Sequence, residues 1–340
     1  MNISLPNQGD VKEKARLAWL LALMSPVFAE LMSGSSPPLE FFIPPFFIGL
    51  LGMYGAGVLL VRETALRWDK GWATIIVLGA AYGIVEEGLA VKSFFDPGWV
   101  DLGDLGGYGR LFDVNWVWAV WLTIFHSAVS ICLPILVLTV LAPAYSRERL
   151  LTGEQYRIVL LAFIADIVIF AVLFSAEYVP PLLQYLGAFV AVVALVIFAK
   201  RLPKDLVSAR HTLPGWSPRR FMLLGFAFLL LSFLVASGLL TREVSPFLTM
   251  LVIVGGSAMM LFMLQHRLGR QGNRVHKAHL AGGFLLVWVF FGVVNEFSGM
   301  LGMSVVAVAT LLLVVDLVRW SGGRAGLTFL RRWRPRATMA

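Results

Sequence analysis

The sequence predicts an all-α fold, a polytopic transmembrane helix bundle of about ten spans. Three observations predict it. Of the 340 residues, 59% are hydrophobic and 14% are charged, with a mean hydropathy of +0.81, whereas a soluble domain carries about a quarter charged residues. The apolar residues gather in runs close to the roughly 20 residues that a helix needs to cross a bilayer. Basic residues gather in every second connection between these runs.

The predicted spans follow one another through the whole chain. In order, they lie near residues 15–32, 41–66, 71–92, 114–142, 157–178, 181–199, 220–240, 245–266, 279–297 and 301–319. Because the connections are short, we expect one membrane domain over residues 1–340 instead of two soluble domains.

The connections alternate in charge. The basic ones are the N-terminal segment 1–14, the loops 200–219 and 267–278 and the tail 320–340, together with the shorter links that carry Arg67, Lys70, Arg147 and Arg149. The loop 93–113 is acidic and rich in glycine and aromatic residues, so it could lie on the membrane surface or cover an outer cavity. The positive-inside rule therefore places both termini in the cytoplasm and loop 93–113 outside, in a multi-pass protein of the plasma or inner membrane.

This topology also places the excess positive charge of the chain, a net +8, mainly on one side of the membrane. We expect it to face the anionic inner leaflet of the bilayer and predict no nucleic-acid partner. The single cysteine, Cys132, lies in an apolar run and cannot form an intrachain disulfide.

Two predicted spans have features of their own. The first resembles a signal peptide, with basic residues, a short apolar core and the cleavage-like sequence Val27-Phe28-Ala29; the apolar run continues past Ala29, which favours an uncleaved span. The second contains Pro44 and Pro45 followed by several glycines, which favours a kinked, tightly packed helix.

Chemistry is expected where ionisable residues interrupt the apolar runs, because a charge inside the bilayer is costly and rare without a use. Glu86 and Glu87 lie in the outer half of the third span, and His126 lies at a similar depth in the fourth. Two close carboxylates next to a histidine can hold and transfer protons, as a base that activates water must. Ser130 follows His126 by one helical turn and could orient that water. Further supporting residues are Glu30, Glu177, Asn295 and Glu296.

This constellation resembles the CAAX-protease and bacteriocin-processing superfamily of intramembrane peptidases. The pattern of that family is Glu-Glu-x-x-x-Arg, then Phe-x-x-x-His, then a later His-x-x-x-Asn or Asp. Glu86-Glu87 matches the start of the first motif, with Val91 at the arginine position, and His126 matches the histidine of the second, with Leu122 at the phenylalanine position. The third motif is not found. The resemblance implies a glutamate-activated water acting on a membrane-anchored peptide, with catalytic Glu86, Glu87 and His126.

Other interpretations stay open. Acidic residues at mid-depth in ten spans also suit a proton-coupled transporter, and a buried polar network can fix a helix bundle without chemistry, as in a scaffold or a subunit of a complex. We predict no cofactor, although two glutamates and a histidine could bind zinc. Gly83–Glu87 is echoed by Gly292–Glu296, which would fit a duplicated transporter half. Substrate, partner subunits and oligomeric state are not indicated.

Overall fold

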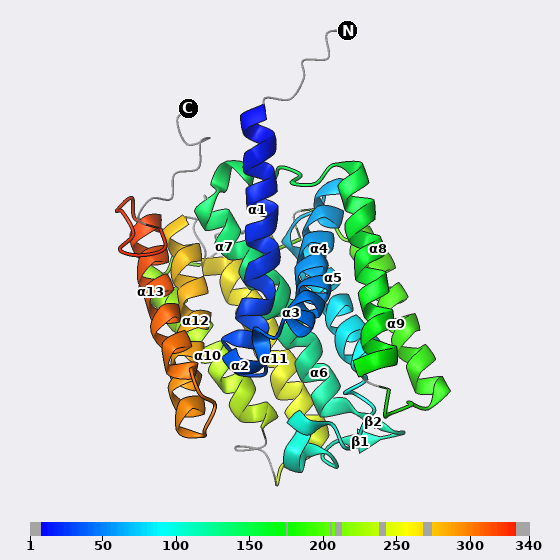
Figure 1. Ribbon diagram of the computed structural model, residues 1–340. Helices are drawn as coiled ribbons and strands as arrows, with labels where there is room; N and C mark the ends of the chain where they lie inside the picture. Colours follow the sequence, from blue (N-terminus) through cyan, green and yellow to red (C-terminus); the bar gives the residue numbers. More distant parts are fainter. Residues whose placement is uncertain are drawn as a thin grey trace.

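The computed structural model describes residues 8–174, 176–204, 206–207, 213–237, 243–267 and 274–330, and it confirms an all-α bundle (Figure 1). The α-helices are α1 (Gln8–Pro26), α2 (Pro38–Phe41), α3 (Pro44–Leu50), α4 (Ala56–Arg67), α5 (Trp72–Ile84), α6 (Trp116–Phe125), α7 (Leu133–Leu141), α8 (Gly153–Ile169), α9 (Leu182–Arg201), α10 (Pro218–Ala236), α11 (Pro246–Arg267), α12 (Arg274–Phe297) and α13 (Met303–Ser321).

Five π-helical turns continue these helices and two short 3-10 helices lie in loops. The π turns are η1 (Val27–Leu31), η2 (Leu51–Gly55), η3 (Val85–Ala90), η5 (His126–Cys132) and η7 (Phe170–Phe174), and the 3-10 helices are η4 (Val100–Leu105) and η6 (Pro143–Tyr145). A two-residue antiparallel hairpin, β1 (Arg110–Leu111) with β2 (Val114–Asn115), folds the loop before α6.

Within the described residues, nine helices are long and apolar enough to cross a membrane, and each coincides with one predicted span. The first predicted span, 15–32, is not among the nine. It forms α1 and η1, a helix that carries Lys14 and Arg16 near one end and Glu30 near the other. The same helix contributes core residues, since Leu17, Leu21 and Phe28 are at most 1% exposed.

The helix ends that carry basic residues lie together at one end of the bundle, at the top of Figure 1. Hydrogen bonds join these ends: Lys70 Nζ donates to the carbonyl of Leu202 at 2.7 Å and Arg274 Nε to that of Val140 at 2.7 Å. The start of α1 and the end of α13 lie at this end, and the hairpin lies at the opposite one. The charge separation follows the predicted topology, while the assignment of this basic end to the cytoplasm stays a prediction.

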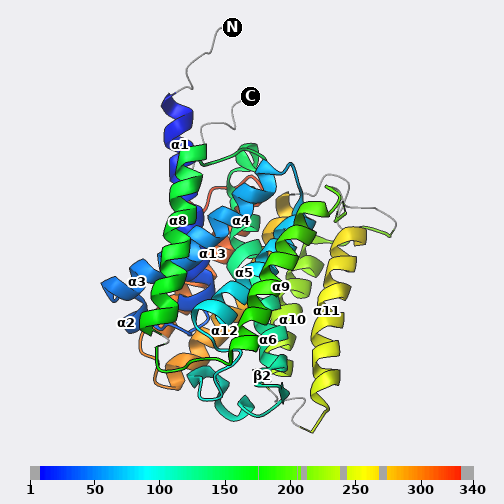
Figure 2. The ribbon, with the colours of Figure 1, turned by 90° about the vertical axis from the view of Figure 1, so that its right-hand side faces the viewer.

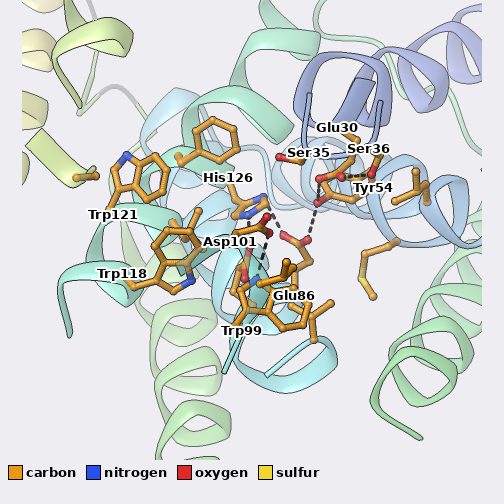
Figure 3. Close-up of a pocket in the computed structure, with 18 of the residues that line it drawn as sticks. Glu30, Ser35, Ser36, Tyr54, Glu86, Trp99, Asp101, Trp118, Trp121 and His126 are labelled. Atoms are coloured by element: carbon orange, nitrogen blue, oxygen red, sulfur yellow. Dashed lines mark hydrogen bonds and ion pairs between the residues drawn. The ribbon is translucent and has the colours of Figure 1, made fainter. Parts of the chain in front are cut away.

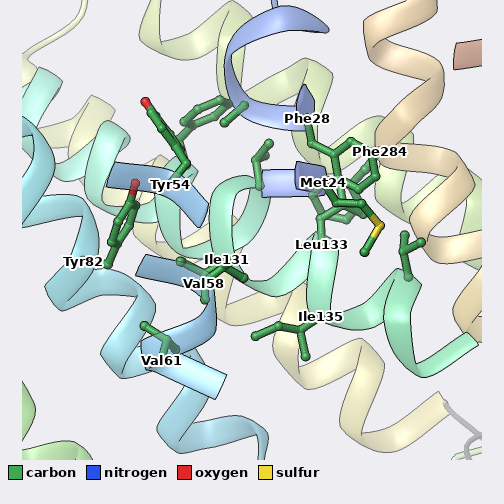
Figure 4. Packing of buried hydrophobic residues seen from close by; sticks show 14 of the residues in the cluster. Met24, Phe28, Tyr54, Val58, Val61, Tyr82, Ile131, Leu133, Ile135 and Phe284 are labelled. Carbon is green, nitrogen blue, oxygen red and sulfur yellow. The ribbon is translucent and has the colours of Figure 1, made fainter. Parts of the chain in front are cut away.

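Buried apolar side chains form one core through the centre of the bundle (Figure 4). It joins Met24 and Phe28 of the first helix to Ile131 of η5 and Phe284 of α12. α10 and α12 pack so closely that a Cβ on Gly283 would lie 2.1 Å from the carbonyl oxygen of Met222. Helices α8, α9 and α11 lie at the periphery with most of their surface open (Figure 2), so the central helices hold the polar residues described next.

Candidate functional site

A cavity of about 540 Å³ lies in the half of the bundle next to the hairpin. All five π turns contribute to its lining. The lining includes Glu30 of η1, Tyr54 of η2, Glu86 of η3, His126 of η5 and Phe170 of η7. π turns inside helices occur frequently at functional sites, because they displace side chains and disturb the regular backbone ladder. The cavity therefore lies where the helices depart from ideal geometry.

Glu86 and Glu87 hold the imidazole of His126 between them. Glu87 Oε1 lies 2.8 Å from Nε2, and Glu86 Oε2 lies 2.8 Å from Nδ1. The three side chains are 5%, 8% and 2% exposed, respectively. On a regular helix, neighbouring residues point about 100° apart; the wider π turn η3 lets both reach one ring. Ion pairs withdrawn from water are screened much less than surface pairs, so this contact is a strong one.

A second chain of hydrogen bonds runs from Glu86 to the first helix (Figure 3). The hydroxyl of Tyr54 lies 2.5 Å from Glu86 Oε1 and 2.6 Å from Glu30 Oε1, and Ser36 Oγ donates to Glu30 Oε2 at 2.6 Å. A phenol has one proton and can donate to only one of the two carboxyls. The other short contact therefore needs a proton on the carboxyl itself, so the two glutamates and Tyr54 share at least two protons.

Neighbouring side chains orient His126 and Glu87. Ser130 Oγ lies 2.9 Å from His126 Nδ1 and competes with Glu86 for that nitrogen. Ser93 Oγ donates to Glu87 Oε2 in a short hydrogen bond, and Trp118 Nε1 donates to Ser93 Oγ at 3.1 Å. Both oxygens of Glu87 are thus occupied, which fixes this carboxylate in place.

Among the residues that the structure describes, three polar atoms at or beside the site have no hydrogen-bond partner. Glu86 Oε2 is at ion-pair distance from His126 without the alignment of a hydrogen bond, and both Trp121 Nε1 and the Tyr82 hydroxyl are unpaired. Glu86 and Trp121 line the cavity. Buried polar groups are satisfied in most native proteins, so an unpaired acceptor and an unpaired donor on one cavity wall point to a ligand with both kinds of group.

The donor set of Glu86, Glu87 and His126 matches zinc ligands in type, and their ligand atoms lie within 4.8 Å of one another. The arrangement does not favour a metal, because each ring nitrogen already faces a carboxylate and the two carboxylates lie at opposite nitrogens. An imidazole offers a single nitrogen to one ion, so a shared ion would require one glutamate to swing around the ring. The geometry is that of an ion-paired histidine.

The remaining wall of the cavity is largely aromatic. Trp118, Trp121 and Phe125 lie on α6, and Phe233 comes from α10. Trp99, Val100 and Asp101 of the acidic loop also line the cavity, so this loop covers it as the sequence indicated. The charged residues of the lining are Glu30, Glu86, Glu87, Asp101 and His126, with no Lys or Arg among the described lining residues.

The predicted site residues divide into two groups. Glu86, Glu87, His126, Ser130 and Glu30 form one connected network.

The other three lie away from this network. Glu177 is exposed in the loop before α9, Glu296 accepts from the backbone N–H of Ser304 at the start of α13, and Asn295 donates to the carbonyl of Ser33. The echo of Gly83–Glu87 at Gly292–Glu296 therefore does not extend to the environment of the side chains, because Val293 and Val294 are 45% and 42% exposed.

Sequence reasoning missed Tyr54, Ser36, Ser93 and Trp118. The four are neutral residues inside or beside apolar runs, so no charge marks them. Lys92 is 7% exposed, and its Nζ donates to the carbonyls of Ala171 and Tyr178. It holds the end of η7 beside the site, since cations are favourable at helix C-termini.

Comparison with known proteins gives one result. A family model described as an uncharacterized membrane protein family matches residues 19–332, which is most of the chain and includes every residue of the network. No curated protein and no solved structure shows a significant match.

Proposed function

The chain belongs to this uncharacterized membrane protein family, and from the geometry of its buried site we propose that it is an intramembrane hydrolase, specifically a peptidase in which Glu86 activates water. The observation that carries the proposal is the Glu86–His126–Glu87 arrangement, with both contacts at 2.8 Å, in the wall of a 540 Å³ cavity. General bases are recognised by such reach and by burial.

Glu86 is the better candidate for the base. Glu86 lines the cavity and its Oε2, although 2.8 Å from His126 Nδ1, makes no hydrogen bond among the described residues, whereas Glu87 is held on both oxygens by His126 and Ser93. In the proposed reaction, Glu86 Oε2 takes a proton from water while the water oxygen bonds to the carbonyl carbon. The C–N bond then breaks, and Glu86 returns the proton to the leaving nitrogen. Glu87 acts as a positioning residue that fixes the ring of His126.

One donor could stabilise the negative charge that develops on the carbonyl oxygen. Trp121 Nε1 belongs to the cavity lining and has no acceptor among the described residues, whereas both nitrogens of His126 already face carboxylates. Donors fixed in advance at such a charge supply a large share of catalysis in acyl transfer. The third motif of the CAAX-protease pattern is missing in this chain, and this donor would take over its role.

A peptide in the membrane is the substrate class that fits best. The aromatic wall suits an apolar segment, and the unpaired donor and acceptor suit the two polar groups of a peptide bond. The resemblance of Glu86-Glu87 and His126 to intramembrane peptidases adds to this choice, although Val91 and Leu122 depart from the family pattern.

The test is cleavage of fluorogenic membrane-anchored peptides by the protein in liposomes. Glu86→Gln should lower turnover by about 10²- to 10⁴-fold, the usual contribution of a general base, and Glu87→Gln and His126→Asn should also lower it. Glu177→Gln and Glu296→Gln make the same chemical change away from the network and should keep full turnover. Size-exclusion chromatography checks that each variant folds. Undiminished cleavage by both Glu86→Gln and Glu87→Gln would refute the peptidase.

A proton-coupled transporter is the second candidate, favoured by the shared protons of Glu30, Tyr54 and Glu86. Such a chain can take up and release a proton during transport. It predicts flux of a substrate driven by a pH gradient across liposomes, with loss of coupling in Glu86→Gln. Peptide cleavage without any pH-driven flux would exclude this alternative, and the reverse result would favour it over the peptidase.

A further inference from the structure

A second cavity, of about 270 Å³, lies between α5, η5, α10, α11 and α12, on the other side of η5 from the site. Ile76, Leu133, Leu136, Phe228, Met260 and Phe284 are typical of its apolar lining. Its two hydroxyls are satisfied within the protein, because Ser127 Oγ donates to the carbonyl of Ile76 and Ser257 Oγ to that of Ile253. Apart from these hydroxyls and Lys277 at one end, the lining is apolar, and apolar cavities take apolar ligands. This cavity therefore suits hydrocarbon.

The size of the cavity fits a segment of a lipid chain. A cavity of about 150 Å³ binds a molecule the size of benzene, and this one is nearly twice as large. Trp72 and Lys277 contribute to its lining from the ends of α5 and α12 that lie at the basic end of the bundle. A chain that fills the cavity would therefore have its polar head near that end.

One basic side chain lies at this position. Lys277 lines the cavity near the start of α12. Across the described part of the chain, no ion pair joins Lys277 to a carboxylate. A cation without an anion at one end of an apolar cavity is complementary to an anionic amphiphile.

We propose that this cavity binds one acyl chain of an anionic phospholipid whose headgroup phosphate lies on Lys277. The bound chain would contact Ser127, Ala128 and Cys132, which belong to the same π turn as His126 and Ser130. The lipid would thus pack against the π turn that carries His126, on the side of that turn away from the site. This inference concerns a separate cavity and does not depend on the proposed peptidase.

The test compares binding of phosphatidylglycerol and phosphatidylcholine to the delipidated full-length protein by native mass spectrometry. Each basic residue near an anionic lipid contributes about 1 kcal/mol, so Lys277 predicts an approximately fivefold preference for phosphatidylglycerol. Lys277→Gln should abolish this preference. Arg219→Gln removes the same charge from an exposed residue at the same end of the bundle and should leave it unchanged.

Cys132, the single cysteine, reports whether the lipid occupies this cavity. Phosphatidylglycerol should slow its alkylation by N-ethylmaleimide, and prior alkylation should block lipid binding. This second readout needs no variant and so does not depend on the folding of one. Equal affinity for both lipids, a preference unaffected in Lys277→Gln, or unprotected Cys132 would each overturn the proposal.

Discussion

Two buried tyrosines beside His126 provide a matched test of the network, because they differ mainly in what their hydroxyls contact. The rings of Tyr54 and Tyr82 both lie 6.1 Å from the imidazole, and both side chains are 3% exposed. The Tyr54 hydroxyl contacts two carboxyls, whereas the Tyr82 hydroxyl has no partner in the described part of the chain. Replacing each by phenylalanine removes one oxygen from the same region of the core.

The expected effects have opposite signs. A hydrogen bond to a charged group contributes about 1.5–3 kcal/mol, so Tyr54→Phe should lower the free energy of unfolding by about 2–3 kcal/mol and leave oxygens of Glu30 and Glu86 unpaired. A buried hydroxyl without a partner costs about 1–3 kcal/mol, so Tyr82→Phe should be neutral or stabilising. The two variants should then differ by about 3 kcal/mol.

The assay is the melting temperature of each purified variant in the same detergent, followed by the loss of monomeric protein on size-exclusion chromatography after heating. At about 2 °C per kcal/mol for a chain of this size, Tyr54→Phe should melt roughly 6 °C below Tyr82→Phe. Equal melting temperatures, or a lower value for Tyr82→Phe, would refute the bridging role of the Tyr54 hydroxyl and the shared protons inferred from it.

Three further predictions concern packing, a buried charge and metal. Arg62→Met should lower stability by about 3–5 kcal/mol, measured by the same melting assay. Arg62 is 2% exposed, its loss takes the donor from the carbonyls of Tyr145 and Glu148, and it leaves Glu63 with only the longer ion pair to Arg67 at 3.5 Å among the described residues; a shift under about 2 °C would contradict this. Gly57→Ala should cost about 1–3 kcal/mol, since its Cβ would lie 2.3 Å from the Tyr82 ring, while Gly187→Ala on α9 meets nothing within 4 Å and should be neutral or stabilising. EDTA should leave the melting temperature unchanged because both nitrogens of His126 face carboxylates; a fall reversed by zinc would show a metal site instead.

The membrane bundle could be predicted from the sequence because the signal for a span is carried locally by about 20 consecutive residues. Nine predicted spans coincide with the apolar helices of the structure. The first differs for a physical reason: α1 and η1 combine a buried apolar stripe with charged residues at both ends, so their role depends on packing against other helices. That packing is not encoded in the local hydropathy.

The site could be predicted only in part, for a related reason. Glu86, Glu87 and His126 stand out because ionisable residues are rare in apolar runs. Tyr54 is neutral and lies 32 residues from Glu86 in sequence, so only the fold shows that it joins Glu86 to Glu30. Glu296 has the charge that marks a candidate, but its position at a helix end lets it accept from the backbone of α13 instead.

The π turns explain why the sequence indicated the residue types of the site but not their arrangement in space. A regular helix through residues 85–90 would direct Glu86 and Glu87 to different neighbours, since their side chains would point about 100° apart. η3 brings both to His126, and η5 places His126 and Ser130 opposite them. Such turns sacrifice regular backbone hydrogen bonding, and here the surrounding helices have the extensive apolar core that can offset this cost. The concentration of five π turns around one cavity is therefore better explained by selection for this polar arrangement than by packing alone.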